Sequence, residues 1–142
     1  MRLLLVEDNQ RLQELVSRVL TGDGFAVDVA SCLADAEAFL SNAEYHLVLL
    51  DLGLPDGDGL EILQHIAEHH GNTPVAVITA FGSTENAVAA LKAGAFDYIA
   101  KPIQLKQLRE VITAALNLPR SQAVPERGRR AAATPRAEPE RE

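Results

Sequence analysis

Five residues with chemically active side chains directly follow four short apolar runs of the chain. In chain order they are Glu7, Asp8, Asp51, Thr79 and Lys101, and the runs before them end at residues 6, 50, 78 and 100. In an open parallel sheet, the carboxyl ends of neighbouring strands lie side by side, and ligands bind in the crevice beyond them. If the four runs are parallel strands of one sheet, we expect three carboxylates, a hydroxyl and an ammonium group to converge there.

The expected crowding of carboxylates indicates a particular chemistry. Like charges at such short range are unfavourable unless a cation or a proton lies among them. Carboxylate oxygens suit Mg²⁺, which typically takes one or two carboxylates and keeps waters and phosphate oxygens. A phosphoryl group in transfer needs positive partners and hydrogen-bond donors for its oxygens, and a carboxylate can act as its nucleophile. The residues therefore favour a Mg²⁺ site and phosphoryl transfer.

Strand-like and helix-like segments alternate along the first 117 residues. We expect strands over 3–6, 25–30, 46–50, 74–78 and 96–100, and helices from Asn9 to Gly22, over 33–40 and 60–67, from a cap at Ser83 to Gly94, and over 105–116. Continuous apolar strands separated by helices are typical of a parallel sheet covered on both faces. The sequence therefore predicts an α/β fold with a doubly wound, five-stranded parallel sheet.

The last 25 residues differ in composition from the rest. Residues 118–142 contain four of the seven prolines, six Arg and four Glu, with almost no large apolar side chain. Such a segment does not bury enough apolar surface to offset the entropy lost on ordering. We expect one folded domain over 1–117 and a disordered Pro/Arg/Glu-rich tail or linker over 118–142.

The net charge of −7 is unevenly distributed. Residues 1–117 hold seven Lys and Arg against sixteen Asp and Glu, which gives −9, whereas residues 118–142 carry +2. Phosphate contacts from Lys and Arg supply most of the non-specific affinity for nucleic acid. We therefore expect the acidic body to be a poor binder of DNA.

Three further features concern the cellular compartment. Glu7 and Asp8 interrupt any apolar stretch of a signal peptide, and no apolar run approaches the ~20 residues that span a bilayer. The single cysteine, Cys32, excludes an intramolecular disulfide and fits a reducing compartment. We expect a cytoplasmic protein without membrane association.

Several short motifs also occur together in a fixed order. They are Glu7-Asp8, Asp51 followed by the loop Leu54-Pro55-Asp56-Gly57-Asp58-Gly59, Thr79-Ala80, and Asp97-Tyr98 ahead of Lys101-Pro102. This joint pattern resembles the receiver domain of bacterial two-component response regulators, with its five-stranded flavodoxin- or CheY-like fold, over residues 1 to 117. The segment 73–108 is most similar to receivers of the NtrC type, whereas the amino-terminal portion resembles the OmpR type equally well.

The resemblance implies roles for the acidic residues. Asp51 would be the phosphoacceptor and would take its phosphoryl group from a sensor histidine kinase or an acyl phosphate. Asp8 and Asp51 would bind Mg²⁺ through their side chains, Gly53 through its backbone carbonyl, and Glu7 through water. The implied function is a signalling switch that assists its own phosphorylation and dephosphorylation, not an enzyme with turnover.

The resemblance also implies a switch. Thr79 would hydrogen-bond the aspartyl phosphate and Lys101 would pair with it, with a cis peptide bond between Lys101 and Pro102. Tyr98 would turn inward as Thr79 moves. The changed face, made of the fourth helix, the last strand and the fifth helix, would control homodimerisation or an output domain that regulates transcription and contacts DNA. Gly53 offers the phosphate no shielding side chain and Phe81 offers bulk, so the sequence leaves its lifetime open.

Alternatives remain open from the residues. A phosphatase resembling haloacid dehalogenases would also use an Asp nucleophile, but it usually carries a second acid at the position that Gly53 occupies here. A receiver-like scaffold that no longer takes phosphate is a further possibility. The chain is either a stand-alone receiver acting by protein–protein contact or the front part of a longer regulator, and the tail favours the second.

Three other motifs have simpler explanations. Residues 56–59, Asp-Gly-Asp-Gly, match an EF-hand or a dinucleotide-binding loop only weakly, and a loop leading into a helix is favoured. His65 and His69 stand four apart, a spacing that permits a metal, but solvated imidazoles near a helix end are favoured. The basic residues at 127–130 resemble a minor-groove arm, but a solvated linker is favoured.

Overall fold

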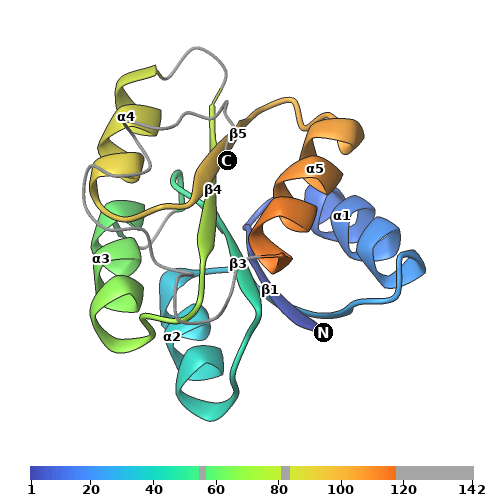
Figure 1. Ribbon diagram of the computed structural model, residues 1–142, viewed down its shortest axis with the longest axis horizontal. Helices are drawn as coiled ribbons and strands as arrows, with labels where there is room; N and C mark the ends of the chain where they lie inside the picture. Colours follow the sequence, from blue (N-terminus) through green and yellow to red (C-terminus); the bar gives the residue numbers. More distant parts are fainter. Residues whose placement is uncertain (55–56, 81–83, 118–142) are drawn as a thin grey trace.

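The computed structural model describes residues 1–54, 57–80 and 84–117, and in them five strands alternate with five helices (Figure 1). The strands are β1 (Arg2–Val6), β2 (Ala26–Ala30), β3 (Leu47–Asp51), β4 (Val75–Thr79) and β5 (Asp97–Ala100). The helices are α1 (Gln10–Gly22), α2 (Leu33–Asn42), α3 (Gly59–His69), α4 (Thr84–Lys92) and α5 (Leu105–Leu116). Every strand pair is parallel, which confirms the predicted fold class.

The strand order β2-β1-β3-β4-β5 determines where a ligand site can form. The chain moves outward from β1 to β2 and then returns to the other side of β1 to add β3. The connection that leaves β1 runs to β2, whereas the connection that leaves β3 runs in the opposite direction, to β4. Ligands in such sheets bind beyond the carboxyl ends of the strands at this reversal. The residues that follow β1 and those that end β3 lie at this reversal.

The two faces of the sheet form two separate apolar cores. Leu4, Val48 and Val77 point to the face covered by α2, α3 and α4. Leu3, Leu49 and Ile78 point to the opposite face, which α1 and α5 cover. This alternation follows from the two-residue period of a strand, and it explains why the strands are apolar at consecutive positions. Figure 1 shows α1 and α5 on one side of the sheet and the other three helices on the opposite side.

Side-chain hydrogen bonds begin two of the helices. The Leu12 N–H donates to Asn9 Oδ1 at 3.1 Å at the start of α1, and the Leu60 N–H donates to Asp58 Oδ1 at 2.9 Å at the start of α3. These contacts satisfy backbone donors that have no partner within the helix. The start at Asn9 was predicted, whereas the predicted cap Ser83 lies outside the described residues, as do Phe81 and the predicted tail 118–142.

Strand β3 extends one residue beyond its prediction and includes Asp51 itself. The reason is that the Leu52 N–H still donates to the Ile78 carbonyl at 3.0 Å, which continues the ladder with β4 past Asp51. Asp51 is thus held by the sheet on its backbone and is only 4% exposed. Because the backbone of Asp51 is already ordered, little further conformational entropy is lost when its carboxylate reacts.

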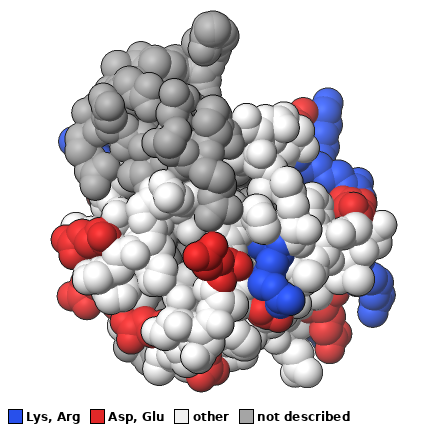
Figure 2. Space-filling model, turned by 60° about the horizontal axis from the view of Figure 1, so that its bottom comes forward, with Lys and Arg blue, Asp and Glu red and all other residues white. Residues whose placement is uncertain are grey.

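Charged side chains are unevenly spread over the surface. Helices α2 and α3 contain four acidic residues and no Lys or Arg, whereas α1 and α5 carry Arg11, Arg18, Lys106 and Arg109. In Figure 2, Lys and Arg gather on the side of the molecule that carries α1 and α5. No helix among the described residues combines the length and apolar composition that crossing a membrane requires.

Candidate functional site

The carboxyl edge of the sheet forms a polar pocket of about 310 Å³ between the ends of β1, β3, β4 and β5. All five residues singled out in the sequence line it, and so do five neighbours among the described residues: Glu7, Asp8, Asp51, Thr79 and Lys101, with Asn9, Leu52, Gly53, Ala80 and Asn86. One carboxylate oxygen from each of Glu7, Asp8 and Asp51 lies within 4.8 Å of the others. The convergence expected from the strand ends is therefore present.

Lys101 supplies the positive charge of the pocket. Its Nζ lies 3.2 Å from Asp51 Oδ2 and 3.5 Å from Glu7 Oε1. Burial lowers the pKa of Lys101, but the Asp51 and Glu7 carboxylates outweigh it, so the pKa lies above its ordinary value. Lys101 is therefore an ammonium at neutral pH, and its reach from the end of β5 brings that charge to the end of β3.

Glu7 is the most deeply buried of the three carboxylate residues of the pocket, with a residue exposure of 1%. Its Oε2 accepts the Asn9 N–H at 3.0 Å, but its buried Oε1 has no hydrogen-bond partner. The 3.5 Å approach of Lys101 is a charge contact and not a hydrogen bond, since it falls at the outer limit of hydrogen-bond length. Burial first, and then the nearby Asp51 carboxylate, raise the pKa of Glu7 to about 7, although the Asn9 N–H lowers it.

These properties fit a divalent cation such as Mg²⁺. The donors are carboxylate oxygens, the ligands that Mg²⁺ prefers, and the described residues that line the pocket include no sulfur or imidazole. The orphaned Glu7 Oε1 and the raised pKa of Glu7 both mark a position where negative charge lacks a sufficient partner. A cation among the three carboxylates would supply that partner.

The other predicted site residues lie around this acidic group. Thr79, only 3% exposed, ends β4, and its carbonyl accepts the Lys101 N–H at 2.8 Å. The Gly53 N–H donates to Asp51 Oδ1 at 2.9 Å. A Cβ at Gly53 would lie 3.6 Å from the same oxygen, so the absence of a side chain there leaves the carboxylate open. The Lys101–Pro102 peptide bond is cis.

Tyr98 lies apart from the pocket. It stands in β5 opposite Val77 of β4, and 38% of it is exposed. Its N–H donates to the Asp97 side chain at 2.8 Å. The structure thus describes an outward-facing tyrosine on the strand whose end carries Lys101.

Two asparagines that the sequence analysis did not select also belong to the pocket. Asn9, expected only as a helix start, donates its N–H to Glu7 and faces the pocket. Asn86 reaches the pocket from the first turn of α4. A signal for Asn86 did exist, because the first turn of the helix after β4 lies beyond the carboxyl edge of the sheet. Asparagine side chains occur on many protein surfaces, however, so the residue type alone gave no reason to select Asn86.

The weaker motifs of the sequence take no part in this pocket. Asp58 caps α3, and a Cβ at Gly59 would lie 2.9 Å from Leu52 Cα, so this glycine permits the start of α3 to pack closely against Leu52. The rings of His65 and His69 stack with centroids 4.3 Å apart. Within the described residues, only Glu7, Asp8 and Asp51 form a group of three that could hold a metal.

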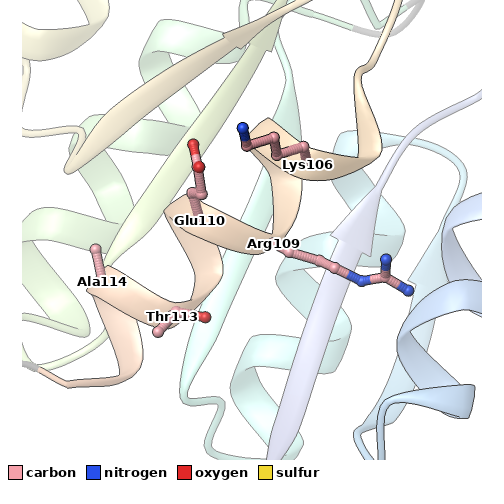
Figure 3. Close-up of a pocket in the computed structure, with 5 residues that line it drawn as sticks. All are labelled: Lys106, Arg109, Glu110, Thr113 and Ala114. Atoms are coloured by element: carbon pink, nitrogen blue, oxygen red, sulfur yellow. The ribbon is translucent and has the colours of Figure 1, made fainter.

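A larger hollow of about 560 Å³ lies along α5 and is lined, among the described residues, by Lys106, Arg109, Glu110, Thr113 and Ala114 (Figure 3). Arg109 extends from α5 toward α1 and forms an ion pair with Asp23, with Nε 2.9 Å from Oδ2. The described lining contains none of the predicted site residues, and its one carboxylate offers a cation no cluster of ligands. The volume of a hollow therefore does not identify the functional site, whereas the chemistry of the side chains that line it does.

Comparisons with known proteins agree with this geometry. Residues 3–113 match the family profile of the response regulator receiver domain. Response regulator protein PilR of Pseudomonas aeruginosa is 42% identical over 115 residues, which are 81% of this chain and 26% of PilR. Transcriptional regulatory protein PmrA of Pectobacterium parmentieri is 40% identical over 116 residues, which are 82% of this chain and 52% of PmrA. The chain thus spans about a quarter of the first relative and about half of the second.

A solved structure extends the comparison to three dimensions. The beryllofluoride-activated NtrC4 receiver domain dimer is similar with a TM-score of 0.74 and 32% identity, over 80% of this chain and 94% of that one. Its activation by beryllofluoride and its dimeric state are properties of that protein. The family match covers the strands, the acidic pocket and Lys101 of the present chain, and the chain therefore belongs to the response regulator receiver family of two-component systems.

Proposed function

We propose that Asp51 accepts a phosphoryl group from the phosphohistidine of a sensor histidine kinase, or from a small acyl phosphate. A carboxylate oxygen of Asp51 attacks phosphorus and forms a P–O bond. The bond between phosphorus and the donor imidazole nitrogen, or the acyl oxygen, breaks, and its electron pair leaves with the donor. The observation that carries the proposal is the Asp51 carboxylate itself, fixed at the end of β3 with the Lys101 ammonium 3.2 Å away.

The neighbours of Asp51 have separate tasks in this reaction. Lys101 Nζ stabilises negative charge on the phosphoryl oxygens, and the Thr79 hydroxyl donates a hydrogen bond to one of them. Asp8, Asp51, the Gly53 carbonyl and, through water, Glu7 would hold Mg²⁺. When bound, Mg²⁺ neutralises charge that develops on the transferring group. Gly53 leaves the phosphoryl group open to water.

The output of the reaction is a change of surface. In the proposal, Thr79 moves toward the phosphate and Tyr98 turns from its exposed position toward the space that Thr79 leaves. The face of α4, β5 and α5 then changes shape and favours a homodimer. The dimeric NtrC4 receiver and the transcriptional regulators among the relatives support this output. DNA would be contacted through a separate output domain, linked to the receiver unit of residues 1–117 by the residues that follow.

A mass measurement tests the proposed acceptor. The protein is incubated with acetyl phosphate and Mg²⁺, and intact mass is recorded for wild type, Asp51→Asn and the control Asp35→Asn, which removes an exposed acid of α2. Wild type and Asp35→Asn should gain the mass of one phosphoryl group, and Asp51→Asn should gain none. EDTA should abolish the gain. A wild type that stays unmodified, or an Asp51→Asn variant that is modified equally, contradicts the proposal.

A further inference from the structure

The side chain of Gln13 folds back from α1 onto the end of β1. Its amide nitrogen Nε2 lies 2.5 Å from the main-chain oxygen of Glu7 and 2.9 Å from Ser31 Oγ. A carboxamide nitrogen carries two N–H donors, so both acceptors can be served at once. Through Gln13, the end of β1, the first turn of α1 and the loop after β2 are joined.

The main-chain oxygen of Glu7 needs a hydrogen-bond donor, because it belongs to a buried residue. Glu7 is 1% exposed, and its N–H already donates to the Ala30 carbonyl at 2.9 Å. Gln13 is the hydrogen-bond donor that the structure shows for the Glu7 carbonyl, a group that is costly to leave unpaired when buried. With Asn9 bonded to the Glu7 carboxylate, every polar part of Glu7 except Oε1 is anchored.

This carbonyl belongs to the peptide group that leads into Asp8. Within the described part of the chain, the exposed Asp8 carboxylate makes no hydrogen bond or ion pair of its own, yet one of its oxygens lies within 4.8 Å of those of Glu7 and Asp51. Its position is therefore set by the backbone that carries it. Rotation of the Glu7–Asp8 peptide group would move the Asp8 carboxylate away from the other two.

We propose that Gln13 is a positioning residue for the divalent-cation site. It fixes the Glu7–Asp8 peptide group and thereby holds the Asp8 carboxylate where a cation can bridge it to Asp51. Gln13 acts from outside the pocket, since it is not among the residues that line it and its amide nitrogen is bonded to backbone and hydroxyl oxygens. The inference rests on the proposed cation site and adds to it a residue from outside the pocket. Residues that orient metal ligands in this way typically contribute about 10- to 100-fold to metal affinity.

The test measures metal binding and not phosphorylation alone. Mn²⁺, a carboxylate-binding stand-in for Mg²⁺, is titrated and free Mn²⁺ is followed by electron paramagnetic resonance. Gln13→Met keeps the length of the side chain and removes both donors, whereas the control Gln10→Met changes an exposed glutamine at the start of the same helix. We expect Gln13→Met to bind Mn²⁺ about 10-fold more weakly or worse, and Gln10→Met to bind like wild type.

A second readout separates positioning from general destabilisation. The thermal midpoint of each protein is measured in EDTA and at one fixed concentration of Mn²⁺. A positioning role predicts that Gln13→Met gains less stabilisation from Mn²⁺ at a given concentration, beyond any loss already present in EDTA. Gln13→Ala is measured in parallel, so that the comparison still stands if the Met variant fails to fold.

The outcomes distinguish this inference from the proposed function. Raising the metal concentration should restore labelling of Gln13→Met by acetyl phosphate to the wild-type extent, because the phosphoacceptor is intact. Equal Mn²⁺ affinity of folded Gln13 variants and wild type overturns the positioning role, even if wild type is phosphorylated. Failure of wild type to be phosphorylated contradicts the proposed function instead, and leaves the comparison of Mn²⁺ affinities valid.

Discussion

The buried carboxyl group of Glu7 makes the stability of the metal-free protein depend on pH. Burial, and then the Asp51 carboxylate, raise the pKa of Glu7 from an ordinary 4.5 to about 7. The folded protein therefore binds this proton more tightly than the unfolded chain does. The stability contributed by protonated Glu7 is fully present below the unfolded pKa and is lost as pH rises through the folded pKa.

The size of the effect follows from the two pKa values of Glu7. The interval from 4.5 to about 7 corresponds to ~3 kcal/mol, since each pH unit of difference is worth about 1.4 kcal/mol. Between about pH 5 and about pH 8, metal-free wild type should therefore lose about 2 to 3 kcal/mol of unfolding free energy through this group. Other groups also titrate, so the quantity to measure is the difference from Glu7→Gln, which lacks the ionisation.

Urea unfolding in EDTA at the two pH values provides the assay, with wild type and Glu7→Gln side by side. The wild-type unfolding free energy, relative to the variant, should fall as pH rises. Saturating Mg²⁺ should reduce the fall, because a cation stabilises the ionised carboxylate. Wild-type and Glu7→Gln curves that run parallel from about pH 5 to about pH 8 would refute the reasoning, since they would show that Glu7 ionises alike in the folded and unfolded states.

Three further predictions concern single side chains. Tyr45→Phe should lower the unfolding free energy, measured in urea, by about 1.5 to 3 kcal/mol. The variant loses the 2.7 Å hydrogen bond from the Tyr45 hydroxyl to the Asp28 carboxylate, and Tyr45 is only 1% exposed. A loss under about 0.5 kcal/mol would contradict this prediction. Leu63→Ala, at a fully buried position of α3, should cost about 2 to 5 kcal/mol by the same assay, and a neutral result would argue against the described core. Gly53→Ala should fold normally, since the added Cβ would lie 3.6 Å from Asp51 Oδ1, an ordinary contact distance. The methyl group should hinder the approach of water and slow the loss of the phosphoryl group, which is followed by intact mass over time. Faster loss than in wild type would contradict this prediction.

The fold class was predictable because the order of apolar residues along each strand indicates how many faces of the sheet are covered. Strands such as β3 and β4 are apolar at consecutive positions, and only a sheet covered on both faces buries all of these side chains. The convergence of Glu7, Asp51 and Lys101 was predictable for a related reason. Residues that follow parallel strands share one edge, whatever their separation in the chain.

Features that depend on three-dimensional contact were not predictable. Gln13 and Asn86 sit on helices, and nothing in their type shows that one reaches back to Glu7 or that the other faces the pocket. The raised pKa of Glu7 requires its burial and its distance from Asp51, neither of which spacing reveals. The hydrogen bond from the buried Tyr45 hydroxyl to Asp28, 17 positions away in the chain, was not predictable for the same reason. Sequence patterns specify edges and faces, whereas individual contacts depend on how side chains pack.

The most direct test of the account is the position of the phosphoryl group. Wild-type protein is labelled with acetyl phosphate and Mg²⁺, the acyl phosphate is trapped by borohydride reduction, and the modified peptide is sequenced by mass spectrometry. Asp51 alone should carry the modification. Reduction at another carboxylate while Asp51 stays unmodified, or no reduced residue at all in labelled protein, would contradict the claim that this pocket is a phosphoacceptor site.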